Sequence, residues 1–297
     1  NNLCKNLHNV IFLTKLLTKQ VALISVFAAL IAVVSRLPGI PIMVGVQSGK
    51  IEFTVPLYPL AGILLGPFVG ALAILIGNVV AFLIPSCSIF GLLTIPAGVL
   101  SALVAGFLTK RSKWLDWKAG AVVLGVLVGL WYVPIPNPQQ AYVGLEAPYY
   151  PIPLHLSALA LIFIFRYKVA DFVNSSAKRL MTLGVALASY IGIMTDHMFG
   201  NLMFANVFFP YFIDLKGFRD FLKSLGIPAV MGGSTKGISG IGDYFMIMLP
   251  VGAVERLIFT AIAIVIGAAV LRIIGPYLTT WKATPLETPI KTPSTTK

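Results

Sequence analysis

Residues 51–83 read IEFTVPLYPLAGILLGPFVGALAILIGNVVAFL, a largely apolar run that is broken near its middle by Gly66 and Pro67. Proline suits the first turn of a new helix, and glycine tolerates the tight turn that must precede it. The stretch therefore predicts a helical hairpin with a short helix at 53–65 and a longer helix at 67–84.

Composition indicates that lipid is the solvent for most of this chain. Hydrophobic residues make up 58% of the 297 residues and charged residues 11%, and the mean hydropathy is +0.91. This leaves too little polar surface for a water-soluble globule. A bilayer core of about 30 Å needs roughly 20 apolar helical residues for each crossing. Such runs predict an all-α membrane protein with about eight transmembrane helices, at about 20–35, 53–65, 67–84, 91–108, 118–133, 151–166, 180–208 and 249–274.

The basic residues predict the side of the membrane on which each loop lies. Lys and Arg concentrate before residue 20, at 110–118, at 166–179 and after 271, which all fall on one side of an eight-span scheme. The positive-inside rule assigns that side to the cytoplasm. We therefore expect a multi-pass plasma-membrane protein with a cytoplasmic N-terminal segment (1–19), a transmembrane domain (20–275), outer loops at about 134–150 and 209–248, and a disordered cytoplasmic tail (276–297).

The sequence shows no motif for catalysis or for metal binding. The two cysteines are Cys4 and Cys87, and no His or Cys pair has metal-ligand spacing. HExxH, GxSxG and DDxxD are absent, and the Gly-rich stretch at 231–244 lacks the GxxxxGK[ST] spacing of a P-loop. The net charge of +12 is spread over the loops and forms no single basic face. We expect no enzyme, no cofactor or metal, and no nucleic-acid partner.

Two stretches resemble the substrate-binding S components of energy-coupling factor (ECF) vitamin transporters. One is the hairpin at 51–83, and the other is FGLLTIPAGVLSALVAGFLTKRSK at 90–113, which resembles the fourth helix of that family and its basic cytoplasmic loop. The resemblance covers about 20–113 and extends to the last span. It implies a six-helix core, to which this chain adds a helical pair and long outer loops.

The resemblance also implies partners. S components work with a transmembrane coupling protein and two ATPase subunits, and in this family an AxxxA spacing on the first helix faces the coupling protein. Ala28 and Ala32 have that spacing here. Small residues at i and i+4 let two helices approach closely in lipid, so internal packing of this pair is the alternative interpretation.

Polar residues inside the predicted seventh span are the first candidates for a ligand site. In TDHMFGNLMFAN, residues 195–206, His197 and Asn201 stand four residues apart and share a helical face with Tyr190. An aromatic stripe with a polar pair suits a flat heterocyclic ligand. Asp196 lies about 100° around the helix, where it could pair with a cation or accept a proton. Hydrogen bonding between helices is the alternative role for all three polar side chains.

Glu255 and Arg256 in the predicted eighth span form the second candidate cluster. Adjacent helical residues do not face each other, so we expect the two side chains to engage different partners. An arginine at this depth suits a carboxylate or phosphate group of a ligand. The alternative is that Arg256 forms an ion pair with Asp196 between helices, or that its side chain extends toward the membrane–water interface.

Three functional hypotheses follow from these features. The first is a membrane-embedded capture subunit that binds a vitamin-like small molecule, such as a flavin, pterin, pyrimidine or biotin, from the outer side. The second is a self-sufficient ion-coupled transporter that uses Asp196 or Glu255 as its coupling carboxylate. The third, an intramembrane enzyme, has no visible catalytic residues. Broken helices and inverted repeats would favour the second hypothesis, and no convincing internal repeat is present.

Overall fold

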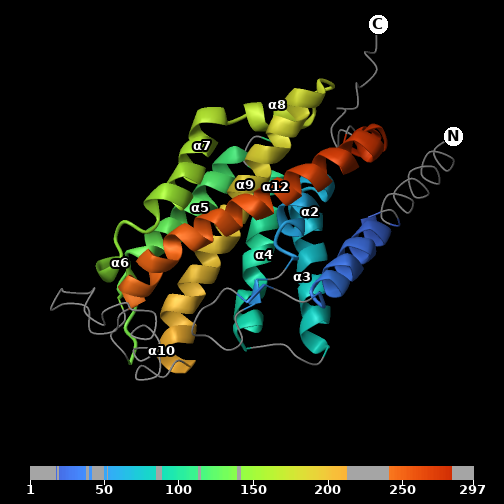
Figure 1. Ribbon diagram of the computed structural model, residues 1–297. Coiled ribbons are helices and arrows are strands. Elements are labelled where there is room, and N and C mark those ends of the chain that lie inside the picture. The colour runs from blue at the N-terminus through green and yellow to red at the C-terminus, as the bar shows by residue number, and fades with distance from the viewer. Residues whose placement is uncertain are drawn as a thin grey trace, which may run out of the picture.

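The computed structural model describes residues 18, 20–37, 40–41, 50–51, 53–84, 89–112, 115–138, 142–212 and 241–282, and these residues form a helical bundle (Figure 1). The only strands in this part of the chain are β1 (Ile40–Pro41) and β2 (Lys50–Ile51), which pair antiparallel. The helices are Gln20–Val34, α2 (Leu57–Leu65), α3 (Pro67–Leu83), α4 (Ile89–Leu108), α5 (Trp117–Trp131), α6 (Val143–Glu146), η1 (Ile152–Leu156), α7 (Ser157–Phe165), α8 (Lys168–Val173), α9 (Lys178–Met203), η2 (Phe204–Phe208), α10 (Phe209–Phe212) and α12 (Ile241–Lys282).

The apolar helices fit a membrane protein. α4 and the part of α12 at Tyr244–Ile273 are long and apolar enough to cross a bilayer, and four shorter apolar helices accompany them. A helix lies at each predicted span. However, α2 has nine residues and rises about 14 Å, which is less than half of a bilayer core of about 30 Å. The number of crossings therefore stays a prediction.

The hairpin at Gly66 and Pro67 is present as predicted. Gly66 has φ of 86°, a backbone conformation that suits glycine, and Pro67 is the first residue of α3. Every residue of α2 is buried. Its close packing depends on Gly62, where an added Cβ atom would lie 1.9 Å from the carbonyl oxygen of Ala102 on α4. The first arm of the hairpin, α2, thus lies at the centre of the bundle.

The AxxxA pair packs inside this chain, as the alternative interpretation of internal packing expects, and its role as a partner interface stays a prediction. Ala28 and Ala32 are 7% and 8% exposed. The helix Gln20–Val34 turns this face toward α3, where a Cβ atom added to Gly77 would lie 2.7 Å from the Cβ atom of Ile31 and 3.0 Å from the carbonyl oxygen of Ala28. The small side chains allow this approach, so the spacing serves internal packing here.

Helices α9 and α12 are longer than the predicted spans. α9 continues through η2 and α10 to Phe212. α12 runs from Ile241 to Lys282 and so extends into the predicted outer loop and tail. At its start, the carboxylate of Glu146 of α6 accepts a hydrogen bond of 3.1 Å from the backbone N–H of Gly242. A carboxylate at this position satisfies one of the N–H groups that have no partner within the helix, and so stabilises the start of α12. The remaining loop and tail, at 213–240 and 283–297, lie outside the described residues.

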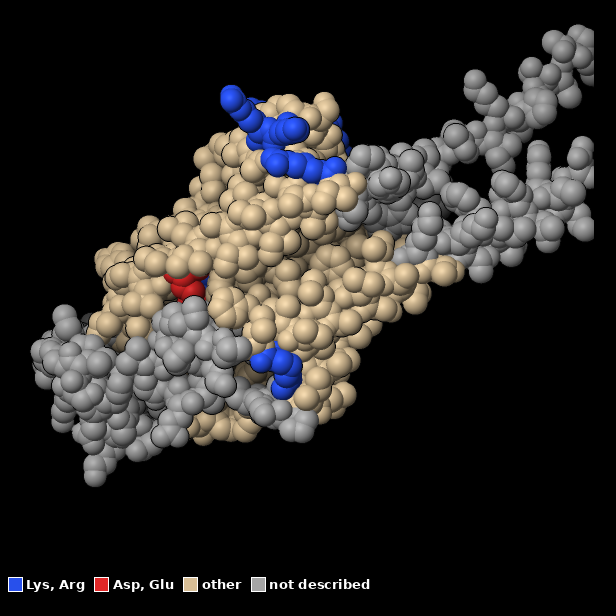
Figure 2. Space-filling view, turned by 45° about the vertical axis from the view of Figure 1, so that its right-hand side comes forward, with Lys and Arg blue, Asp and Glu red and all other residues tan. Residues whose placement is uncertain are grey.

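Basic side chains gather at one end of the described part of the bundle (Figure 2). In Figure 1, α8 lies at the upper end and α6 and α10 at the lower end. Figure 2 shows Lys and Arg side chains gathered at the upper end, with one further basic patch lower down. The positive-inside rule, applied to the basic segments 110–118 and 166–179, predicts that this end lies on the cytoplasmic side.

Candidate functional site

Two histidines from distant parts of the chain meet inside the bundle. His197 of α9 stacks on His155 of η1, with ring centroids 5.2 Å apart and planes 25° apart. Both are buried. Gly252 of α12 lies opposite, so that a Cβ atom there would be 3.6 Å from Cε1 of His197. His197 was predicted from the sequence and His155 was not, although His155 is also an ionisable residue inside a predicted span, which is a signal for a functional site.

Asn201 is held by a tyrosine that the sequence did not single out. Its side-chain amide donates a hydrogen bond of 3.0 Å to the hydroxyl of Tyr150. The Tyr150 ring stacks on Trp131, with ring centroids 5.0 Å apart and planes 19° apart. It also makes a T-shaped contact with Phe245, with ring centroids 4.9 Å apart. Burial raises the pKa of Tyr150, so its phenol stays protonated at neutral pH. These contacts fix the face of Asn201 next to His197.

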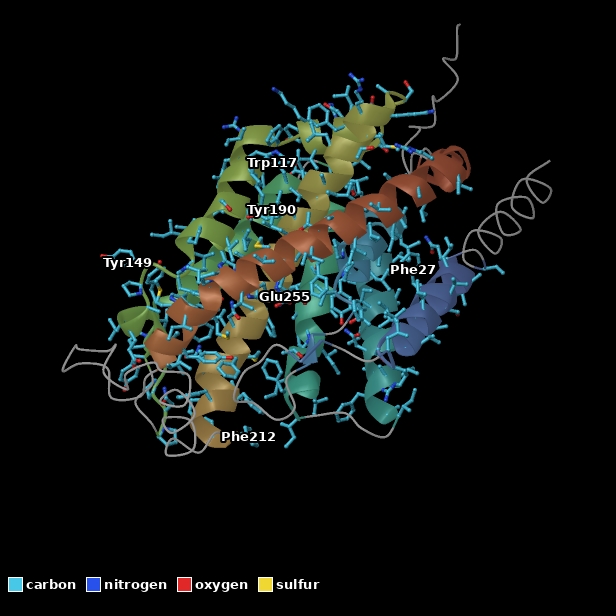
Figure 3. All side chains as sticks on the ribbon, viewed as in Figure 1. Phe27, Trp117, Tyr149, Tyr190, Phe212 and Glu255 are labelled. Atoms are coloured by element: carbon cyan, nitrogen blue, oxygen red, sulfur yellow. The ribbon has the colours of Figure 1, made fainter. Side chains whose placement is uncertain are left out.

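The three charged candidates form one buried cluster. Arg256 lies 3.4 Å from a carboxylate oxygen of Asp196 and 3.0 Å from one of Glu255. The three side chains are between 10% and 13% exposed. The predicted alternative of an ion pair between Asp196 and Arg256 is confirmed, whereas the expectation that Glu255 and Arg256 engage different partners is wrong. The long arginine side chain can fold back over its neighbour's carboxylate while it also reaches α9. Figure 3 labels Glu255 where α12 passes α9.

Several buried polar atoms of this region lack a hydrogen bond within the described part of the chain. They are Nδ1 and Nε2 of His155, Nδ1 of His197, Oε1 of Glu255 and Nε of Arg256. Oε1 of Glu255 thus lies 3.0 Å from Arg256 as an ion pair, but the two groups are not oriented for a hydrogen bond. Buried polar groups in proteins are nearly always satisfied, so a cluster of exceptions points to a missing partner such as a ligand or water. The region offers both donors and acceptors to such a partner.

Aromatic side chains lie next to this polar cluster. Phe204 of η2 contacts Phe90 of α4 at 6.0 Å, stacks on Tyr244 of α12 at 5.3 Å and meets Phe245 at 6.0 Å, measured between ring centroids. Tyr190 lies apart from this group. Its hydroxyl lies 2.8 Å from Oγ of Ser157 and donates to the carbonyl oxygen of Leu154 at 3.3 Å. Tyr190 therefore fixes η1, the segment that carries His155.

Removing the Tyr150 hydroxyl tests whether this arrangement is built on hydrogen bonds. Tyr150→Phe removes the hydrogen bond that the partly buried amide of Asn201 donates, so we expect the free energy of unfolding to fall by about 0.5–1.5 kcal/mol. The control is Tyr149→Phe, because Tyr149 is 68% exposed and adjacent in the chain (Figure 3). Thermal unfolding in mild detergent measures both. Equal midpoints for the two variants would show that the Asn201 contact contributes nothing.

The fold and the site together define an apolar helical membrane protein with a buried polar and aromatic cluster. Residues 15–135 match the model of a family described as ECF-type riboflavin transporter, S component. The resemblance to ECF S components predicted from the sequence is thereby confirmed for this segment. The family is one of transporters rather than enzymes.

A curated relative covers part of the chain. An uncharacterized protein of Methanocaldococcus jannaschii is 32% identical over 162 residues, which is 54% of this chain and 50% of the relative. The chain thus spans about half the length of this relative. No solved structure matches the chain. The buried cluster draws His155, Asp196, His197, Asn201 and Arg256 from residues beyond the segment that the family match covers.

Proposed function

We propose that this chain is the membrane-embedded substrate-capture subunit of an ECF-type importer and that it binds a flavin-like vitamin from the outer side. The observation that carries the proposal is the family match at 15–135, which names a riboflavin transporter S component. The buried cluster between η1, α9 and α12 supplies the binding groups. The protein would be a multi-pass plasma-membrane protein with cytoplasmic ends.

The chemistry of the cluster suits a flavin. The flavin ring system is flat, and one edge alternates carbonyl acceptors with an N–H donor. Arg256 and the amide of Asn201 can donate to such carbonyls, and an imidazole nitrogen of His155 or His197 can accept from the N–H. Asp196 and Glu255 orient Arg256 through the ion pairs at 3.4 and 3.0 Å. Phe204, Tyr244 and Phe245 offer rings for stacking.

Tyr190 contributes to this proposed site indirectly. Its hydrogen bonds to Ser157 and to the carbonyl oxygen of Leu154 hold η1 against α9, and η1 carries His155. Five-residue π-helical segments such as η1 and η2 occur frequently at functional sites. Both segments border the polar and aromatic cluster described above.

The proposed partners are a transmembrane coupling protein and two ATPase subunits. The sequence has no P-loop, so import driven by ATP would need ATPase subunits on other chains. Contact of the coupling protein with Ala28 and Ala32 would require the helix Gln20–Val34 to move away from α3, because both side chains are buried there. Its opposite face, with Val21, Val26 and Val33 at least 60% exposed, is open without such a movement.

Co-purification tests the coupled importer directly. The tagged chain is isolated from its native membrane in mild detergent, and the accompanying proteins are identified by mass spectrometry. We expect one coupling protein and a pair of ATPases. Recovery of the chain alone in every mild detergent would contradict this proposal.

An ion-coupled carrier is the second candidate, because two carboxylates share a single guanidinium in the buried cluster. Asp196 and Glu255 both lie beside Arg256 within predicted spans, and a carboxylate at such a depth can bind a transported proton or sodium ion. The purified chain alone in liposomes distinguishes the candidates. A capture subunit gives no uptake under a pH or sodium gradient. Uptake that is lost in Glu255→Gln would establish the carrier instead.

A further inference from the structure

Cations and aromatic rings interleave at the end of the bundle that carries α8. The guanidinium carbon of Arg166 lies 5.7 Å from the ring centroid of Trp117, and Nζ of Lys118 lies 6.0 Å from the same ring. Beside them, Arg111 lies 6.0 Å from the ring of Tyr167, whose edge meets Trp117 at 6.1 Å. We call these five residues the inner-end cluster. Figure 3 labels Trp117 in this region, and Figure 2 shows Lys and Arg side chains at this end of the molecule.

The charge of the inner-end cluster is not fully balanced. Arg111 pairs with Asp171, and Lys118 lies 3.6 Å from the buried carboxylate of Asp116. Arg166 donates from Nε to the carbonyl oxygen of Phe163 at 2.9 Å. No carboxylate pairs with Arg166 within the described part of the chain. Its terminal nitrogens therefore remain available for an anion.

The backbone holds Arg166 in a costly conformation. It has φ of 44° and is the one residue other than glycine with positive φ among those described. Such a conformation costs about 1–3 kcal/mol and persists where surrounding contacts enforce it. Here the residue ends α7, with its N–H bonded to the carbonyl oxygen of Ile162. The turn directs the side chain over Trp117, at a position where glycine would fit without strain.

The surface next to these cations is apolar. Leu115, Phe163 and Ile164 are 40%, 49% and 65% exposed. Tryptophan and tyrosine favour the level of the lipid headgroups, and arginine binds phosphate with its planar fork of donors. Exposed apolar side chains beside the guanidinium of Arg166 match a molecule that has an anionic head and hydrocarbon chains. Headgroups of anionic lipids attract basic residues at the cytoplasmic surface.

We propose that the inner-end cluster is a binding site for the phosphate headgroup of an anionic phospholipid, with Arg166 as its principal cation. The acyl chains lie along the exposed apolar side chains of α7, next to Phe163 and Ile164. This site lies apart from the buried cluster at η1, α9 and α12. The proposal depends on embedding in a membrane and not on the identity of the captured vitamin, so either can fail alone.

Retention of lipid by the purified full-length protein tests the site. The protein is reconstituted in nanodiscs of equal phosphatidylglycerol and phosphatidylcholine and extracted in mild detergent, and bound lipids are counted by native mass spectrometry. Arg166→Gly removes the guanidinium and fits the backbone, so the fold should persist. We expect the ratio of retained phosphatidylglycerol to phosphatidylcholine to fall about fivefold. Lys178→Gln, an exposed cation at the start of α9, should leave the ratio unchanged.

Two results would overturn the proposal. One is a ratio in Arg166→Gly equal to that of the unsubstituted protein, with both proteins unfolding at the same temperature or the variant at a higher one. The other is loss of the bound phosphatidylglycerol on addition of inorganic phosphate at constant ionic strength, because that would show a site for a free anion. Retention of the lipid in inorganic phosphate, with the fivefold loss in Arg166→Gly, supports the lipid site.

Discussion

Arg256→Met is expected to abolish vitamin binding and to lower the free energy of unfolding by about 3–5 kcal/mol. The substitution leaves the carboxylates of Asp196 and Glu255 close together without the cation that lies 3.4 and 3.0 Å from them. Removing one partner of a buried ion pair has a cost of this size, because the remaining charge is uncompensated. Thermal unfolding in detergent and a ligand titration measure the two effects on the same sample.

The control for this variant lies on the same helix. Arg272→Met changes an exposed arginine of α12, so its effect on unfolding should stay within about 0.5 kcal/mol. Arg256→Lys separates charge from shape, because lysine keeps the cation but lacks the planar fork. We expect Arg256→Lys to recover most of the stability and little of the binding. Unchanged stability in Arg256→Met would contradict the buried cluster.

Gly62→Ala is expected to destabilise the fold by about 3 kcal/mol or more. The new Cβ atom would lie 1.9 Å from the carbonyl oxygen of Ala102 and 2.8 Å from its carbon. Both are backbone atoms of α4, so no side-chain rotation relieves the clash, and overpacking of this kind falls at the costly end of its range. The yield of monodisperse protein after detergent extraction, together with its unfolding midpoint, measures the effect.

A second glycine of the bundle provides the matched control. At Gly125 of α5, an added Cβ atom meets nothing within 4 Å. Gly125→Ala should therefore stabilise the helix by about 0.5–1 kcal/mol, because alanine loses less backbone freedom. Equal behaviour of the two variants would show that α2 and α4 do not pack through Gly62.

The hairpin and the helix positions could be predicted from the sequence because their determinants are local. Gly66 and Pro67 specify a turn through their own backbone preferences, and apolar runs specify helices through their length. The ends of α12 could not be predicted in this way. Its start depends on Glu146, which lies 96 positions away from Gly242, so no local signal marks it.

Most polar residues of the buried cluster could also be predicted, because Glu255 and Arg256 are ionisable residues within a predicted span. Asp196, His197 and Asn201 share one helix, where their spacing is visible in the sequence. Their partners His155 and Tyr150 come from another segment, and only the tertiary fold brings them within ring contact of His197. The AxxxA pair shows the opposite difficulty. Small residues permit close approach of any helix, so Ala28 and Ala32 could not reveal whether α3 or another protein packs on them.

Riboflavin titration of the purified chain tests the capture function most directly. The chain is prepared free of small molecules, and quenching of flavin fluorescence is followed as protein is added. We predict saturable quenching with one flavin per chain, retained in Arg272→Met and lost in Arg256→Met. Absence of quenching by folded protein, with no small molecule found in extracts of the native preparation, would contradict the proposed function.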